Sequence, residues 1–407
     1  MSLNNTPRAN RLHIGIFGRR NAGKSSLINA LTGQNLAIVS DTPGTTADPV
    51  YKSMELHPIG PVVFIDTAGF DDEGELGQLR VAKTADVIAK TDVAILVTDG
   101  SAANCEYEKS WLERLEKAGV PVIAVLNKID EPGESSDCAS KDSDAFASAL
   151  RVSAKTGEGV EELRAAIANA VPEEFMQDKI LGELLEDGSL VMLVMPQDIQ
   201  APKGRLILPQ VQTLRELLDR KCSVMSTTAD GFTKALSALS KAPNLIITDS
   251  QCFHEVYEKK PEQSALTSFS ILMAAAKGDI DVFMDGVSAI DEALTDGASA
   301  APFRVLIAEA CTHVPLQEDI GTVKIPRLLH KIFGDRIAIT NVRGNDFPDV
   351  EGLKQYDLII HCGACMFNRR HVMSRISAAR EAGVPITNYG IFLAKTAGIL
   401  DKVCLPK

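Results

Sequence analysis

Residues 18–25 read GRRNAGKS, which fits the phosphate-binding pattern G-x-x-x-x-G-K-[ST]. The stretch follows an apolar run at residues 12–17 and begins an amphipathic run at residues 24–31, so it predicts a strand, a glycine-rich turn and a helix. In such a turn, backbone N–H groups and the helix N-terminus bind phosphates, while Lys24 reaches the β- and γ-phosphate oxygens and Ser25 ligates Mg²⁺. The stretch therefore predicts a nucleotide site that opens an α/β domain.

Three further motifs follow in the order that a nucleotide site on one sheet requires. Asp66-Thr67-Ala68-Gly69 comes after an apolar run, which places a carboxylate near the magnesium and a glycine N–H near the γ-phosphate. Asn127-Lys128-Ile129-Asp130 follows the apolar run at residues 120–126. Ser153-Ala154-Lys155 lies where a third base-contacting loop is needed. Together with residues 18–25, these motifs predict that phosphates, metal and base are bound at one edge of a parallel sheet.

The carboxylate of Asp130 predicts which base is bound. It can accept hydrogen bonds from N1–H and from the 2-amino group of guanine, whereas adenine has an unprotonated N1 and no 2-amino group. Since a buried carboxylate would stay unpaired against ATP, we expect strong selection for GTP and GDP.

Residues 41–46 read DTPGTT, and together with Asn21-Ala22-Gly23-Lys24-Ser25 they resemble the Era and tRNA-modification-type bacterial GTPases. The resemblance implies that Thr46 closes on Mg²⁺ and that Asn21 helps to hold a K⁺ ion, so hydrolysis should be faster in potassium. With these two residues added, the predicted nucleotide-binding residues are Gly18, Asn21, Ala22, Gly23, Lys24, Ser25, Ser26, Thr46, Asp66, Gly69, Asn127, Lys128, Asp130, Ser153, Ala154 and Lys155, of which Ser25 and Thr46 are the predicted magnesium ligands.

The residue that would activate water is missing from its usual place. Phe70 follows Gly69 where Ras-like proteins have a glutamine, and a phenylalanine cannot orient water. We therefore expect slow hydrolysis, on the order of 10⁻³ per second or less, as in unassisted small GTPases, which suits a switch. The acidic stretch at residues 71–75 is interpreted as a solvated loop, and no catalytic base is assigned.

Composition excludes several classes of protein. The chain has 407 residues, 45% of them hydrophobic, which predicts two to three domains at about 150 residues each. The formal net charge of −12 argues against general affinity for nucleic acid or an anionic membrane. No apolar stretch approaches the roughly 20 residues that span a bilayer, and residues 1–10 lack the apolar core of a secretion signal. We expect a cytoplasmic protein with reduced thiols.

Strand and helix patterns alternate along the whole chain, which predicts an α/β fold with three domains. The first is an N-terminal P-loop G domain at residues 1–172, and two smaller parallel-sheet α/β domains are expected at residues 173–260 and 261–407. The strands expected in the later domains are residues 190–195, 222–225, 244–248, 304–308, 336–340, 357–360 and 385–388.

Two groups of soft metal ligands follow expected strands of the third domain. Cys311-Thr312-His313 comes after the first of these strands, and His361-Cys362-Gly363-Ala364-Cys365 comes after another. Because the carboxyl ends of parallel strands share an edge, these loops can bring five ligand-type side chains together. Three thiolates with one or two imidazoles can hold tetrahedral zinc or three corners of a cubane iron–sulfur cluster.

The pattern C-x-H, 47 residues, then H-C-x-x-C resembles that of the HydF family of GTPases, which mature [FeFe]-hydrogenase. The resemblance covers nearly the whole chain. It implies a homodimer formed through residues 173–260 and a [4Fe–4S] cluster bound by Cys311, Cys362 and Cys365. A fourth iron position would be held by His313 or His361, or left exchangeable so that a di-iron precursor can bridge there. The implied partners are the radical-SAM maturases that make this precursor and the apo-[FeFe]-hydrogenase that receives it.

Two other interpretations remain open at this point. One is an Era-like GTPase of RNA modification or ribosome assembly with a structural zinc, although the acidic balance weighs against it. The other is a redox sensor whose cluster gates GTP turnover. Residues 303–407 contain 14 Lys and Arg against 10 Asp and Glu, so this part of the chain is positive. The cations considered as neighbours of an anionic di-iron fragment, or simply as surface residues, are Arg304, Arg343, Arg369 and Arg370.

Overall fold

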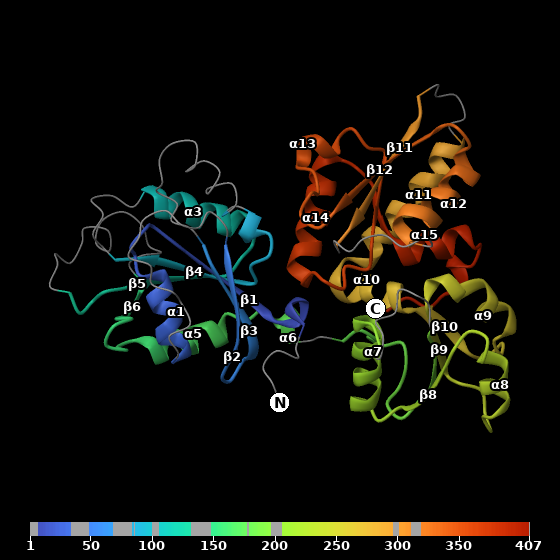
Figure 1. Cartoon of the computed structure of the whole chain (residues 1–407), viewed down its shortest axis with the longest axis horizontal. Helices are drawn as coiled ribbons and strands as arrows, with labels where there is room; N and C mark the ends of the chain where they lie inside the picture. Colours follow the sequence, from blue (N-terminus) through green and yellow to red (C-terminus); the bar gives the residue numbers. More distant parts are fainter. Residues whose placement is uncertain are drawn as a thin grey trace. The chain divides into compact units, whose positions relative to one another are not determined.

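The computed structural model describes residues 7–33, 49–67, 84, 86–99, 106–131, 148–176, 179–196, 206–295, 301–310 and 319–406. The chain divides into two compact units, Met1–Gln177 and Asp178–Lys407 (Figure 1). The first contains one sheet and the second contains two.

The first unit is built on a six-stranded sheet in the order β2-β3-β1-β4-β5-β6. Apart from β2, the strands are parallel. Its elements are η2 (Arg8–Asn10), β1 (Leu12–Gly18), α1 (Lys24–Thr32), β2 (Val50–Leu56), β3 (Gly60–Asp66), β4 (Val93–Thr98), α3 (Glu106–Lys117), β5 (Val122–Leu126), β6 (Leu150–Arg151), α5 (Val160–Asn169) and α6 (Glu173–Met176).

Both faces of this sheet are covered by helices, which is why its central strands consist of continuous apolar runs. Successive side chains of a strand point to opposite faces. Ile16 of β1 packs with Leu27 of α1 on one face, while Phe17 packs with Trp111 of α3 on the other. Figure 1 shows α1 and α5 on one side of the strands and α3 on the other. The packing holds the carboxyl ends of β1, β3, β4 and β5 at one edge.

One strand of this sheet differs from the sequence-based expectation. No strand is expected at residues 50–56, and the strand β2 that forms there runs antiparallel to β3. Only residues 57–59 connect the two strands, whereas a crossover to a parallel strand needs about a dozen residues or more. The sequence does alternate between apolar and polar residues at Met54, Glu55 and Leu56, which is the period of a strand with one buried face.

The second unit contains two four-stranded sheets in the orders β10-β9-β7-β8 and β12-β11-β13-β14, and all strands within each are parallel. The first sheet and its helices comprise β7 (Leu190–Val194), α7 (Leu208–Asp219), β8 (Ser223–Thr227), α8 (Phe232–Ser237), β9 (Leu245–Thr248), η4 (Ser250–Cys252), α9 (Phe253–Lys259), β10 (Ala265–Ser268) and α10 (Phe269–Lys277). The second comprises α11 (Ile280–Thr295), β11 (Phe303–Glu309), η5 (Ile320–Lys324), α12 (Ile325–Phe333), β12 (Ile337–Arg343), α13 (Val350–Leu353), β13 (Leu358–His361), α14 (Arg369–Ala382), β14 (Ile386–Asn388), α15 (Tyr389–Thr396) and η6 (Leu400–Lys402).

The two sheets of the second unit share one hydrophobic core. A domain boundary is expected at residues 260–261, after a sheet of three strands. Strand β10 lies beyond that boundary and pairs with β9, so the sheet has four strands and continues past it. Met192 and Ile246 of this sheet belong to the same buried cluster as Val305 and Leu358 of the other. Residues 265–268 read ALTS and lack the apolar run that marks the other short strands, which is why the sequence pattern missed β10.

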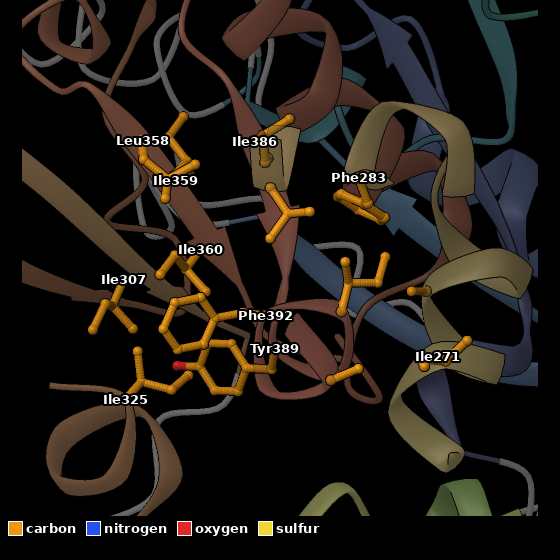
Figure 2. Packing of buried hydrophobic residues seen from close by; sticks show 14 of the residues in the cluster. Ile271, Phe283, Ile307, Ile325, Leu358, Ile359, Ile360, Ile386, Tyr389 and Phe392 are labelled. Atoms are coloured by element: carbon orange, nitrogen blue, oxygen red, sulfur yellow. The ribbon is translucent and has the colours of Figure 1, made fainter. Parts of the chain in front are cut away.

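The core of the last sheet fixes the strand ends that carry the cysteine motif. Figure 2 shows Ile307 of β11 and Ile360 of β13 packed with Phe392 of α15, and the same cluster includes Phe283 of α11 and Ile271 of α10. Burying one such side chain contributes roughly 1.5–3 kcal/mol. Many of them together hold β11 and β13 in register, with Ala308 opposite His361.

Within the residues that the structure describes, no helix combines the length and the apolar character that crossing a bilayer requires.

Candidate functional site

The phosphate-binding loop connects β1 to α1. Gly23 has φ of 87°, and a Cβ atom there would lie 2.2 Å from Nδ2 of Asn127, so only glycine fits this position. The Lys24 ammonium is buried and donates to the carbonyl oxygens of Gly18 (2.9 Å) and Arg19 (2.8 Å). The loop therefore wraps around the cation that is expected to meet the β- and γ-phosphates.

A second pair of groups forms the predicted magnesium site. Ser25 at the start of α1 donates its hydroxyl to Oδ2 of Asp66 at the end of β3, with the two oxygens 2.6 Å apart. Hydroxyl and carboxylate oxygens are the ligands that Mg²⁺ prefers. Thr67 donates to the carbonyl of Ile16 at 2.7 Å and so ties β3 to β1. The residues present fit the metal, while Thr46 and Gly69 lie outside the described residues.

The base-binding motifs are linked to the phosphate loop through Asn127. Its Nδ2 donates to the carbonyl of Ala22 (3.0 Å), and its Oδ1 accepts from the N–H of Ala154 (3.1 Å). Ser153 donates to Oδ1 of Asp130 at 2.6 Å. This hydrogen bond lowers the pKa of the Asp130 carboxyl, with a smaller contribution from the Lys155 ammonium. Asp130 is thus held ionised, as the acceptor of two guanine N–H groups must be.

These residues surround a cavity of about 590 Å³. Of the predicted nucleotide-binding residues, Gly23, Ser26, Asn127, Lys128, Asp130, Ala154 and Lys155 line it. The sequence patterns missed Asn29, Ala30, Gly33 and Glu131, which also line it. Residues 26, 29, 30 and 33 recur at helical spacing, so the face of α1 next to the base could have been found from its period.

Arg19 of the phosphate loop has a partner that the motifs do not indicate. Its Nε and Nη2 lie 2.7 and 3.0 Å from the two carboxylate oxygens of Glu108 on α3, which is fully buried. The guanidinium also lies over the ring of Tyr107, 4.9 Å from its centre. This two-point ion pair attaches the loop to α3.

The cysteine motif forms a turn at the end of β13. The N–H of Cys362 donates to the carbonyl of Ala308 on β11, and Sγ of Cys362 accepts from the N–H groups of Ala310 (3.1 Å) and Ala364 (3.4 Å). Such N–H···S contacts suit a thiolate that ligates metal. Burial raises the pKa of Cys362 to about 11, and burial also raises that of Cys365 against the opposing effect of Lys277.

The structure brings Cys362 and Cys365 together on this turn, whereas Cys311 and His313 lie outside the described residues. Ala310, the residue that precedes Cys311, is the one that donates to the sulfur of Cys362. Among the described residues, no three His, Cys, Asp or Glu side chains are grouped so as to hold a metal.

The imidazole of His361 is buried and uses both of its nitrogens. Nδ1 lies 2.8 Å from the carbonyl oxygen of Cys362, and Nε2 lies 3.0 Å from Nη1 of Arg375. Since a carbonyl only accepts and a guanidinium only donates, Nδ1 carries the proton and Nε2 accepts. Burial and then the Arg375 charge lower the pKa of His361 to about 3. In this arrangement, neither nitrogen has a lone pair available for iron.

Arginines considered from the sequence have partners within the second unit. Arg304 pairs with Asp357, Arg343 pairs with Glu309, and Arg369 donates to the carbonyls of residues 276 and 278. Two cations that no motif spacing marks contact the cysteine turn or its His361, namely Lys277 on α10 and Arg375 on α14.

Comparisons with known proteins match three successive parts of the chain to protein families. A family described as 50S ribosome-binding GTPase matches residues 13–128, the hydrogen maturase F dimerization domain matches residues 180–278, and the hydrogen maturase F tetramerization domain matches residues 281–406. The tRNA modification GTPase MnmE of Nitrosomonas eutropha is 37% identical over 186 residues, which is 44% of this chain and 40% of that protein. MnmE of Paraburkholderia xenovorans is 40% identical over 154 residues, which is 38% of this chain and 33% of that protein.

The chain thus spans less than half the length of the curated relatives that it matches. Among solved structures, a probable GTP-binding protein engB is 26% identical with a TM-score of 0.31, over 40% of this chain and 99% of that one.

The phosphate loop, the magnesium pair and the guanine pocket on this sheet define a P-loop GTPase, which binds GTP or GDP with Mg²⁺ and hydrolyses GTP. The two hydrogen maturase F matches together cover more than half of the chain. The chain belongs to the hydrogen maturase F family, as the resemblance indicated. The descriptions of its two later domains also support oligomerisation.

Proposed function

We propose that this chain binds a [4Fe–4S] cluster through Cys311, Cys362 and Cys365. We further propose that it carries a di-iron precursor from radical-SAM maturases to apo-[FeFe]-hydrogenase. The observation that carries this proposal is the meeting of two strand ends. The backbone of Ala310, next to Cys311 in the sequence, contacts the sulfur of Cys362 at 3.1 Å. Cys365 follows on the same turn, and this contact between the ends of β11 and β13 supports the proposal.

The donor chemistry at this turn fits an iron–sulfur cluster with one position not held by a thiolate. Two sulfurs lie on one turn, and that of Cys362 accepts two backbone N–H bonds. With His361 occupied by Arg375 and Cys362, the fourth iron position falls to His313 or to an exchangeable ligand. Such a position would supply the iron at which a di-iron fragment is held, because imidazole exchanges more readily than thiolate.

GTP binding and hydrolysis are proposed to determine how long the chain stays bound to these partner proteins. Asp130 selects guanine, and the phenylalanine at position 70 favours slow turnover, so either nucleotide state would last long enough to bias partner binding. We propose that Asn21 helps to hold K⁺ in this site, and that the chain acts in the cytoplasm as a homodimer. The residues proposed for dimerisation are those of the β7 to β10 sheet.

The alternative, an RNA-linked GTPase with a structural zinc, has less support. The MnmE relatives match at most 44% of the chain, whereas residues 180–278 and 281–406 match hydrogen maturase domains. The acidic balance of the chain also disfavours binding to a phosphate backbone.

Anaerobic reconstitution with iron and sulfide tests the proposal. The wild-type chain should turn brown and show thiolate-to-iron absorption, which Cys362→Ser should abolish and Cys404→Ser should leave intact. When loaded with the di-iron fragment, the wild-type chain should restore hydrogen evolution to an apo-hydrogenase. A colourless protein that holds one zinc would instead support the RNA-linked alternative, and a cluster-bearing protein that activates no hydrogenase would support the redox sensor.

A further inference from the structure

Arg375 on α14 is a buried cation in an unusual setting. Its side chain is 3% exposed, and its guanidinium carbon lies 4.6 Å from the ring centres of both Phe347 and Phe367. Nη2 donates to the carbonyl of Gly344, Nη1 donates to Nε2 of His361 at 3.0 Å, and Nε is buried without a hydrogen-bond partner. The guanidinium is thus held between two aromatic faces, with one of its N–H groups unsatisfied.

No carboxylate neutralises this charge in the part of the chain that the structure describes. Its neighbour Arg343, by contrast, pairs with Glu309 at 2.9 Å. An unpaired buried charge is costly, so buried cations normally meet an anion. An anionic group that binds beside the cysteine turn would neutralise the charge of Arg375.

The contacts of Arg375 lead directly to the cysteine turn. His361 accepts from Arg375 at one ring nitrogen and donates from the other to the carbonyl of Cys362, at 2.8 Å. Lys277 at the end of α10 donates to carbonyls of the same turn, those of Ala364, Cys365 and Phe367, at 3.3, 3.3 and 2.6 Å. Two buried cations from separate helices therefore contact the cysteine turn, Lys277 directly and Arg375 through His361.

We propose that Arg375 is the charge-balancing and positioning residue of the iron–sulfur site, with His361 as its link to Cys362. This inference rests on the proposed function. Three thiolates on an oxidised [4Fe–4S] core leave a single negative charge, and one-electron reduction doubles it. A fixed positive charge stabilises the reduced form more than the oxidised form, because the attraction grows with the charge of the cluster. Arg375 thus raises the reduction potential and completes its own neutralisation when the cluster binds.

The test compares variants of the full-length chain after anaerobic reconstitution with iron and sulfide, in an EPR-monitored titration with dithionite. Arg375→Met keeps an unbranched apolar stem and removes the charge, a change that buried sites often tolerate. It should lower the equilibrium constant for reduction at least tenfold, which is about 59 mV for a one-electron couple. Arg375→Lys restores an ammonium but not the stacked guanidinium, so its potential should lie between those of Arg375→Met and the wild type. The matched control is Arg380→Met on the same helix, whose exposed side chain pairs with Asp279.

A potential in Arg375→Met within twofold of the wild-type equilibrium constant, at equal iron content, would overturn the inference while the proposed function stands. A wild-type chain that assembles no cluster would overturn both.

If Arg375→Met does not fold, His361→Asn decides the question, because it keeps a donor for the carbonyl of Cys362 and removes the acceptor for Arg375. It should retain the cluster and shift the potential in the same direction. Should pulsed EPR of the reduced wild-type cluster instead show a directly bound nitrogen that His361→Asn removes, His361 would be an iron ligand and the inference would fail.

Discussion

The nucleotide site and the cysteine turn both lie at the carboxyl ends of parallel strands, but their charges are balanced differently. Around the phosphate loop, Arg19 pairs with Glu108, and Asp130 accepts from Ser153. At the cysteine turn, Arg375 is buried without a carboxylate in the described part of the chain. The first site can therefore keep its shape before a ligand arrives, while the second holds positive charge that an anionic ligand would neutralise.

The largest expected effect comes from removing the acceptor that selects guanine. Asp130→Asn should weaken GDP binding by about 100-fold or more, since two hydrogen bonds to a charged group are lost at roughly 1.5–3 kcal/mol each. Titration with a fluorescent GDP analogue measures this loss. Xanthosine diphosphate should recover affinity, because an amide can donate to the 2-oxo group of xanthine.

Glu131→Gln, a change at the neighbouring carboxylate in the same cavity, should leave GDP affinity within about threefold and serves as the control. Equal losses in Asp130→Asn and Glu131→Gln would mean that general charge, and not base contact, determines the affinity.

Breaking the ion pair between Arg19 and Glu108 tests whether the charges around the phosphate loop are neutralised by protein groups before a ligand binds. Arg19→Ala should destabilise the first unit by about 3 kcal/mol, because the buried Glu108 carboxylate is left unpaired. The single tryptophan of the chain, Trp111 on α3, reports unfolding of this unit in denaturant. Arg20→Ala, at an exposed position beside it, should cost less than about 0.5 kcal/mol. Similar losses in both variants would show that the pair has no special role.

Acid should affect the second unit through His361. Its folded pKa of about 3 lies below the ordinary value of 6.5, so its contribution to stability is present above pH 6.5 and is lost as the pH falls toward 3. The loss should be on the order of 2 kcal/mol or more over this range. Urea unfolding followed by circular dichroism between pH 7 and pH 4 measures this loss.

His361→Asn should be the control for this titration, because the amide does not ionise in this range. An identical acid dependence in His361→Asn and wild type would assign the effect to other groups.

The smallest expected effect concerns the monovalent cation. GTP turnover should be up to about tenfold faster in KCl than in NaCl at equal ionic strength, a difference of about 1.4 kcal/mol in activation free energy. Asn21→Ala should remove this difference and leave the rate in NaCl nearly unchanged. Equal rates of the wild-type chain in the two salts would exclude a potassium site.

The nucleotide site was predictable because its chemistry lies in short motifs at strand ends. Gly23, Lys24, Asn127 and Asp130 could each be placed by spacing alone, since a strand followed by a helix fixes where backbone N–H groups point. The pairing of Arg19 with Glu108 was not predictable, because 89 residues separate the partners and only the packing of α3 brings them together. The residues of α1 that line the cavity recur at helical spacing in the sequence, but that spacing alone does not show that this face of the helix lies beside the cavity.

The amino-acid sequence alone determined the class of protein, the choice of guanine, the strand ends that carry the cysteines, and the family. Only the tertiary structure showed that His361 uses both ring nitrogens, that Arg375 donates to one of them, and that Lys277 donates to carbonyls of the turn. The physical reason is that a motif encodes local backbone geometry, whereas the surroundings of a buried charge depend on which helices pack over the strand. Lys277 and Ala364 are 87 residues apart in the chain, and only the shared core that packs α10 beside this sheet makes them neighbours.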